Sequence, residues 1–172
     1  MRRSVTSVIL GVGLLALTAC GSNGTTQEVV PSSPSITEAA SFDDVSANII
    51  GTQTSFSLTA ALAESPVVFW FWAPGCGTCN REAPSVEEVS KKFSGKVRIV
   101  GVAWNGTDDS YLNFIDRHSL TFDNLDDTSA QIFSEYDVPS QPAWAFVHQD
   151  GTVDTRMGVI PQDELVNLLE NL

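Results

Sequence analysis

The stretch FWAPGCGTCNREAP, residues 71–84, carries two cysteines, Cys76 and Cys79, that are separated by only two residues. The apolar run from Val67 to Trp72 predicts a buried strand, and the segment from Arg81 to Phe93 predicts a helix. The pair is therefore expected at a strand-to-helix junction, where the free N–H groups of a helix start favour a thiolate. Because the thiolate is the nucleophile of disulfide exchange, we expect Cys76 to be the attacking sulfur of a redox-active pair.

Two alternatives for this pair stay open on the residues alone: an inert structural disulfide, and half of a metal site. A zinc site takes about four Cys or His ligands. Beyond the pair, the chain offers only Cys20, His118 and His148. We therefore expect no metal at the pair and no other cofactor.

The first twenty residues, MRRSVTSVILGVGLLALTAC, have the layout of a secretory signal: two arginines, an apolar stretch and then small residues. The apolar stretch is short for a stable membrane span. Residues 17–20 resemble a bacterial lipobox, which implies a signal peptide at 1–19 and acylation of Cys20. The alternative is an ordinary signal peptide that leaves Cys20 as a free thiol. We expect the lipid, which would hold the protein on the extracytoplasmic face of the cell membrane.

Two further segments follow the expected signal peptide. Residues 20–41 are rich in Gly, Ser, Thr and Pro, and such a segment buries too little surface to offset its ordering entropy, so we interpret it as a flexible tether. Residues 42–172 have the length of one domain with a single core. The net charge of −12 argues against nucleic acid as a partner. We expect a monomer.

Strands and helices alternate along residues 42–172. Apolar runs predict strands at 67–72, 97–104, 143–148 and 152–158, with a short strand or hairpin near 49–58. Apolar residues three and four apart predict helices at 82–93, 110–118, 130–136 and 161–172. The segment near Phe122 is expected to be a further strand or irregular. The order of these elements describes an α/β domain, a mixed sheet covered by helices on both sides.

The quoted stretch resembles the active-site segment of thioredoxin-like proteins, and YDVPSQPAWAFV, residues 136–147, resembles their second signature. The resemblance spans residues 42–172 and implies a thioredoxin fold: a central mixed β-sheet flanked by helices, here with an N-terminal strand or hairpin extension. It also implies that Pro142 is cis and packs beside the catalytic disulfide, which an X–Pro bond allows at modest cost. The alternative is a trans proline that starts a strand.

The same resemblance bears on substrate binding. In the family, the backbone just before the proline pairs with an incoming peptide like an added strand, so Gln141 is expected to contact substrate. The residue before the first cysteine is commonly Trp in the family, whereas this chain has Gly75 there. An aromatic wall is therefore lost, and we expect partner contact at Gly75 and the exposure of Cys76 to differ from those of the relatives.

Cys79, Glu82 and Pro84 reproduce the C-x-x-E-x-P pattern of the secreted or lipid-anchored branch of the superfamily. This branch holds proteins similar to TlpA, ResA and DsbE, including the actinobacterial DsbE/DsbF-like group. The resemblance implies that Glu82 tunes the thiol pKa values or moves a proton from the resolving Cys79. The alternative is a glutamate that only stabilises the first helical turn. Cytosolic thioredoxins carry a buried aspartate where this chain has Trp70, which leaves Glu82 as the only nearby candidate for proton handling.

The same two cysteines serve an oxidase or a reductase. The resemblance to the DsbE/DsbF-like group favours an oxidase that introduces disulfides into exported proteins. The resemblance to TlpA and ResA keeps open a membrane-anchored reductase, for example in cytochrome c maturation. A third hypothesis is a non-enzymatic thioredoxin-like binding lipoprotein. The partners implied are thiols or disulfides of exported proteins and a membrane redox partner.

Overall fold

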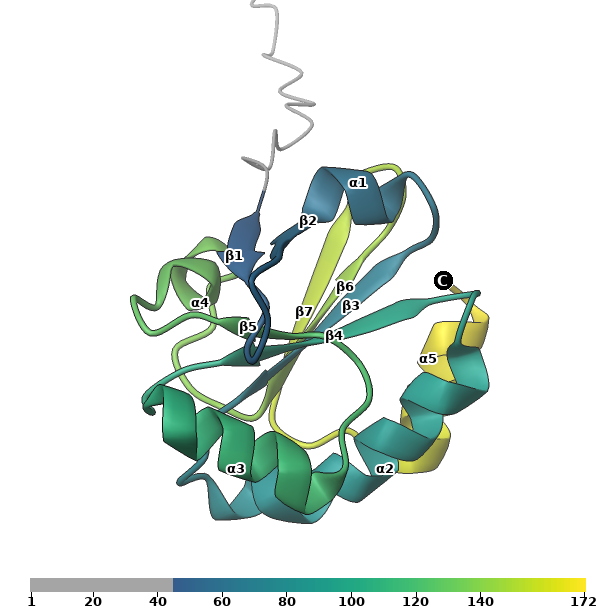
Figure 1. Ribbon diagram of the computed structural model, residues 1–172. Helices are drawn as coiled ribbons and strands as arrows, with labels where there is room; N and C mark the ends of the chain where they lie inside the picture. Colours follow the sequence, from purple (N-terminus) through teal and green to yellow (C-terminus); the bar gives the residue numbers. More distant parts are fainter. Residues whose placement is uncertain (1–44) are drawn as a thin grey trace, which may run out of the picture. The chain divides into compact units, whose positions relative to one another are not determined.

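The computed structural model describes residues 45–172 (Figure 1). The expected signal peptide at 1–19, the tether at 20–41 and the lipidation site Cys20 lie outside the described residues. In the described part of the chain, no helix has the length and apolar character needed to cross a membrane.

A mixed sheet lies at the centre of residues 45–172. Its strands follow the order β5-β4-β3-β6-β7. They are β3 (Val67–Trp72), β4 (Arg98–Ala103), β5 (Asn124–Asp126), β6 (Ala143–Val147) and β7 (Val153–Met157). Strands β3, β4 and β5 run parallel, whereas β6 pairs antiparallel with both β3 and β7. The expected mixed sheet and its C-terminal hairpin are confirmed.

Helices cover both faces of this sheet (Figure 1). The helices are α1 (Leu58–Leu62), α2 (Gly77–Phe93), α3 (Asp108–His118), α4 (Gln131–Glu135) and α5 (Gln162–Glu170). Helices α2, α3 and α5 pack on one face, and α1 and α4 on the other. The second face also carries the hairpin of β1 (Ser46–Asn48) and β2 (Ser55–Ser57), which is the expected N-terminal extension.

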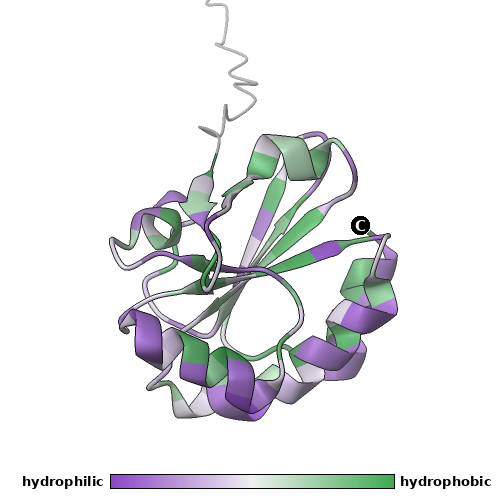
Figure 2. Ribbon diagram, in the orientation of Figure 1, coloured by the Kyte–Doolittle hydropathy of each residue, from purple (hydrophilic) through white to green (hydrophobic). Residues whose placement is uncertain are grey.

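Strand β3 lies in the middle of the sheet because both of its faces are apolar. Trp70 and Trp72 face α2 and α3, whereas Phe69 and Phe71 face the hairpin and α4, and all four side chains are fully buried. Successive side chains of a strand point to opposite faces, so a continuous apolar run suits a strand that is covered on both sides. Figure 2 shows the resulting pattern, with green central strands and purple outer surfaces on α2 and α3.

Helices α1 and α2 differ most from the sequence prediction. Helix α1 was not predicted; Ser57 starts it, because its side chain accepts a hydrogen bond from the Ala60 N–H. Helix α2 starts at Gly77, before the start predicted at Arg81 or Glu82. Glu82 therefore lies in the second turn, and the alternative that it stabilises the first turn is wrong.

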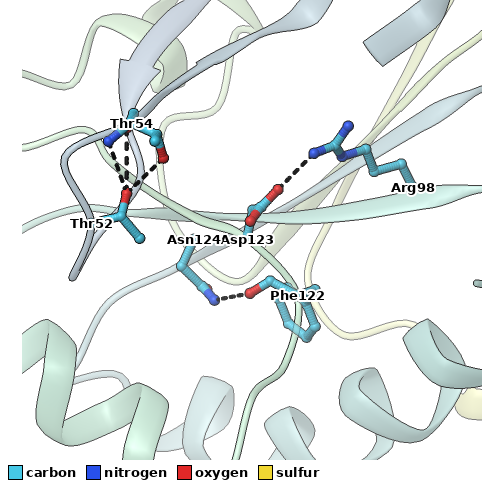
Figure 3. A network of polar contacts seen from close by, with 6 residues as sticks. All are labelled: Thr52, Thr54, Arg98, Phe122, Asp123 and Asn124. Atoms are coloured by element: carbon cyan, nitrogen blue, oxygen red, sulfur yellow. Dashed lines mark hydrogen bonds and ion pairs between the residues drawn. The ribbon is translucent and has the colours of Figure 1, made fainter. Parts of the chain in front are cut away.

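A polar network fixes the segment before β5 (Figure 3). The Asn124 side chain donates to the Phe122 carbonyl at 2.8 Å and accepts the Trp72 indole N–H at 3.0 Å. Arg98 on β4 pairs with Asp123 at 2.8 Å. Phe122 itself lies outside β5, which begins two residues later, so the segment around it is irregular.

Candidate active site

The two cysteines of the quoted stretch lie where β3 gives way to α2. Cys76 is the N-cap residue of α2, and its sulfur accepts a hydrogen bond from the Cys79 N–H at 3.0 Å. Cys76 and Cys79 form a disulfide with a Cα–Cα distance of 5.2 Å. Cys79 is fully buried, whereas Cys76 is partly exposed. Of the two sulfurs, Cys76 is therefore the one that a partner can reach.

The first turn of α2 provides a positive environment for the Cys76 sulfur. It contains no acidic residue, and the helix that it starts is 17 residues long. The free N–H groups and the macrodipole of such a helix favour negative charge at its start. Arg81 adds a cation, since its guanidinium donates to the Thr78 hydroxyl at 3.0 Å. These features together favour a thiolate at Cys76 once the disulfide is reduced.

Pro142 precedes β6 at the same end of the sheet at which β3 leads into the cysteine loop. The Gln141–Pro142 peptide bond is cis. The residue that follows, Ala143, is paired in register with Phe71 near the end of β3. Pro142 is buried, and its carbonyl accepts the Gly158 N–H at 2.8 Å, while Gln141 stays half-buried.

Gly75 leaves the approach to Cys76 open. It is exposed, and a Cβ atom placed on it would meet no atom within 4 Å. A side chain at this position would therefore stand free in solvent beside the sulfur.

Glu82 is a buried carboxylate on the same side of the sheet as the disulfide. It is 5% exposed; its Oε2 accepts the Trp70 indole N–H at 3.0 Å, and its Oε1 accepts the Ile160 N–H at 3.2 Å. Burial raises the pKa of Glu82, and the contacts with Trp70, Ile160 and Trp144 only partly oppose the rise. The Trp144 indole N–H makes no hydrogen bond of ordinary length and angle within the described residues, yet it faces this carboxylate.

Cys79 and Glu82 lie one helical turn apart on α2, and both are buried. Residues three apart on a helix lie on the same face, so the resolving sulfur and the buried carboxylate are neighbours. A carboxyl group with a raised pKa keeps its proton to a higher pH than an ordinary carboxyl, and in that form it can give the proton to a departing thiolate.

Comparisons with known proteins place this geometry in a family. A model of the AhpC/TSA family matches residues 38–156. The chain belongs to the AhpC/TSA family. The soluble secreted antigen MPT53 of Mycobacterium tuberculosis is 38% identical over 109 residues, which cover 62% of this chain and 62% of MPT53. The chain therefore spans less than two thirds of the length of this curated relative.

Two solved structures support the same family. MTB dsbF, solved in mixed oxidized and reduced forms, superposes with a TM-score of 0.70 at 34% identity, covering 74% of this chain and 94% of that one. A secreted M. tuberculosis disulfide oxidoreductase homologous to E. coli DsbE gives a TM-score of 0.69 at 32% identity, covering 75% and 96%. The expected thioredoxin-like fold and the expected DsbE/DsbF-like relatives are confirmed.

Trp70 has a role at the site that its sequence pattern did not indicate. It was expected only as part of a buried strand, and its indole instead holds the Glu82 carboxylate. The sequence signal for this role was the absence of the aspartate that cytosolic thioredoxins carry at this position. Here the buried acid is Glu82 on α2, and β3 contributes the Trp70 indole that donates to it. Within residues 45–172, no three His, Cys, Asp or Glu side chains gather as a metal site would need.

Proposed function

We propose that this protein is an extracytoplasmic thiol-disulfide oxidoreductase that exchanges disulfides with exported proteins through Cys76 and Cys79. The carrying observation is the asymmetry of the pair: Cys76 is partly exposed at the start of α2, and Cys79 is buried behind it. In this proposal Cys76 is the sulfur that partners attack, and Cys79 is the leaving sulfur in the oxidase direction and the resolving sulfur in the reductase direction. Pro142 and Gln141 form the wall along which the partner peptide lies.

The oxidase direction follows from ordinary thiol chemistry. A substrate thiolate attacks the Cys76 sulfur, a new disulfide forms, and the bond to Cys79 breaks, leaving a thiolate there. Glu82 supplies the proton that this thiolate takes up. A second substrate thiolate then attacks the substrate sulfur of the mixed disulfide, and Cys76 leaves as a thiolate. Two substrate thiols are oxidised to a disulfide, and the protein's disulfide is reduced to a dithiol by the same two electrons.

The site favours this direction because it stabilises the reduced form. A dithiol whose attacking sulfur is held as a thiolate is a stronger oxidant, since stabilising the reduced form raises the reduction potential. The N-cap position of Cys76, its contact with the Cys79 N–H and the Arg81 cation all act in this sense. The presence of Thr78 where reducing thioredoxins carry proline agrees with it.

The reduction potential of the Cys76–Cys79 couple decides the direction. We expect a value near or above about −180 mV when the protein is equilibrated against glutathione redox buffers. A value near or below about −250 mV would instead assign the protein as a reductase that a membrane electron carrier supplies. A variant with Thr78→Pro tests the contribution of the residue at position 78, and we expect it to lower the reduction potential.

The proposal also includes a lipid anchor on Cys20, a membrane redox partner and a monomeric state. The lipobox-like end of the apolar N-terminal stretch supports the anchor. In a bacterial host that lipidates exported proteins, the full chain is expected to sediment with membranes, and Cys20→Ser is expected to move it to the soluble fraction. Soluble wild-type protein with an unmodified Cys20 would contradict the anchor.

A further inference from the structure

The side chain of Asn80 joins the cysteine loop to the end of α3. Its Nδ2 donates to two backbone carbonyls of the loop, that of Cys76 at 2.9 Å and that of Pro74 at 3.2 Å. On the other side, its Oδ1 accepts from His118 Nε2 at 3.0 Å and from Arg117 Nη1 at 3.3 Å. One amide group therefore links the loop that presents the sulfur to the last two residues of α3.

These partners fix the orientation of the amide. Backbone carbonyls can only accept hydrogen bonds, so the NH₂ group of Asn80 must face them and its oxygen must face α3. His118 Nε2 must then carry a hydrogen, because it donates to that oxygen. Burial and the neighbouring Arg117 lower the pKa of His118, and its ring packs on Phe114 with the ring centroids 4.6 Å apart. A neutral imidazole with its hydrogen on Nε2 meets all of these conditions.

We propose that Asn80 is a positioning residue for the attacking sulfur. The Cys76 carbonyl accepts both the side chain and the backbone N–H of Asn80, the latter at 3.0 Å. With the Pro74 carbonyl also held, the backbone on either side of Gly75 is fixed. This backbone in turn holds the Cys76 sulfur at 3.0 Å from the Cys79 N–H, the donor that stabilises a thiolate. The inference rests on the proposed function, since it concerns the reactivity of the same sulfur.

The step that Asn80 affects is the ionisation of Cys76 in the reduced protein, in which the thiol loses a proton to water. Without the Asn80 amide, the two carbonyls lose a donor and the loop is free to move away from the start of α2. The thiolate then loses part of its hydrogen bond, and the pKa of Cys76 rises. At a pH below that pKa, the fraction of thiolate and the rate of alkylation fall together.

The test measures alkylation of Cys76 by iodoacetamide in the reduced full chain, from pH 4 to 9, with the modified peptide identified by mass spectrometry. For Asn80→Ala, we expect a raised pKa of Cys76 and an alkylation rate about fivefold lower at pH values below the pKa, the effect of about one net hydrogen bond. Asn171→Ala is the matched control, because the Asn171 amide also donates to a backbone carbonyl, that of Asn167 in α5. It is expected to leave the profile unchanged.

The hydrogen bond from His118 to the Asn80 oxygen gives an independent test that leaves Asn80 in place. His118→Leu removes a donor to the Asn80 oxygen and is expected to raise the pKa of Cys76 by less than Asn80→Ala does. His118→Gln can still offer an N–H and is expected to return the profile toward that of the wild type. If Asn80→Ala does not fold, this pair of His118 variants decides the question.

An unchanged alkylation profile in a folded Asn80→Ala protein would overturn the positioning role, as would a shift of equal size in Asn171→Ala. Disulfide exchange by the wild type is measured alongside with a reduced substrate protein. If the wild type shows no exchange, the proposed function fails whatever the Asn80 profile is. If the wild type exchanges and Asn80→Ala has the same profile, only the present inference fails.

Discussion

Cys76→Ser is expected to reduce disulfide exchange to the uncatalysed background, whereas Cys79→Ser that carries glutathione on Cys76 is expected to keep exchange above it. The reason is the difference in exposure: Cys76 is partly exposed at the start of α2, and Cys79 is fully buried. Exchange is measured as the oxidation of a reduced substrate protein by the oxidised wild type, with the serine variants run as their glutathione mixed disulfides. The double variant, Cys76→Ser with Cys79→Ser, sets the background.

The hypothesis of a purely structural disulfide predicts a different result. Loss of either cysteine would then lower the free energy of unfolding by about 2 kcal/mol, the chain-entropy effect of closing so short a loop, and wild-type exchange would already equal the background. Wild-type exchange that persists in Cys76→Ser would contradict the assignment of the attacking sulfur.

Glu82→Gln is expected to stabilise the protein at neutral pH and to leave its stability unchanged in acid. Burial raises the pKa of Glu82 above its ordinary value of 4.5. Between 4.5 and the raised pKa, the folded state binds more protons at this site than the unfolded state, so the free energy of unfolding falls as the pH rises through this window. Each unit by which the pKa is raised costs the wild type about 1.4 kcal/mol once the pH exceeds the raised pKa. The uncharged glutamine does not carry this cost.

Urea unfolding of wild type and Glu82→Gln from pH 4 to 8 measures this difference. The two proteins are expected to match near pH 4, and the variant is expected to gain as the pH rises. Trp70→Phe is the complementary variant, because it removes the indole N–H that Glu82 Oε2 accepts. It should raise the pKa of Glu82 further and extend the loss of stability to higher pH. Equal stability of wild type and Glu82→Gln at all pH values would contradict the raised pKa.

The same variant separates the two roles of Glu82 in exchange. If Glu82 gives a proton to the Cys79 thiolate, Glu82→Gln slows exchange in the oxidase direction and flattens its pH dependence. If the carboxylate serves only to pack against Trp70 and Ile160, exchange keeps the wild-type rate and pH profile.

Local patterns predicted much of this fold, because its central elements are strongly apolar. The six-residue apolar run from Val67 to Trp72 favoured a strand buried on both faces, and its position before the cysteines indicated the strand-to-helix junction. The short helix α1 escaped prediction because five residues are too few to show a helical period. The start of α2 was placed late because the residues from Gly77 to Arg81 are not apolar and gave no periodic signal.

The polar contacts of the site could not be predicted in the same way, because they join residues far apart in the sequence. Glu82 was singled out, but its raised pKa depends on burial beneath Trp144 and Ile160, which a sequence pattern does not report. Asn80 and His118 are 38 residues apart, and only the packing of α2 against α3 brings them together. The sequence showed that Trp70 replaces the aspartate of cytosolic thioredoxins, but only the structure showed that its indole donates to Glu82.

The central claim, that Cys76 is the sulfur that partners attack, is tested most directly by capturing the mixed disulfide. The Cys76→Ser and Cys79→Ser variants, each treated so that the remaining cysteine of the pair carries 2-nitro-5-thiobenzoate in a mixed disulfide, are incubated with a reduced substrate protein. A substrate thiolate that attacks this cysteine releases 2-nitro-5-thiobenzoate, and the products are mapped by mass spectrometry under non-reducing conditions. We expect a substrate peptide linked to Cys76 in Cys79→Ser, and little or no adduct in Cys76→Ser. Equal capture by Cys79 in the Cys76→Ser variant, or no capture by either, would contradict the account.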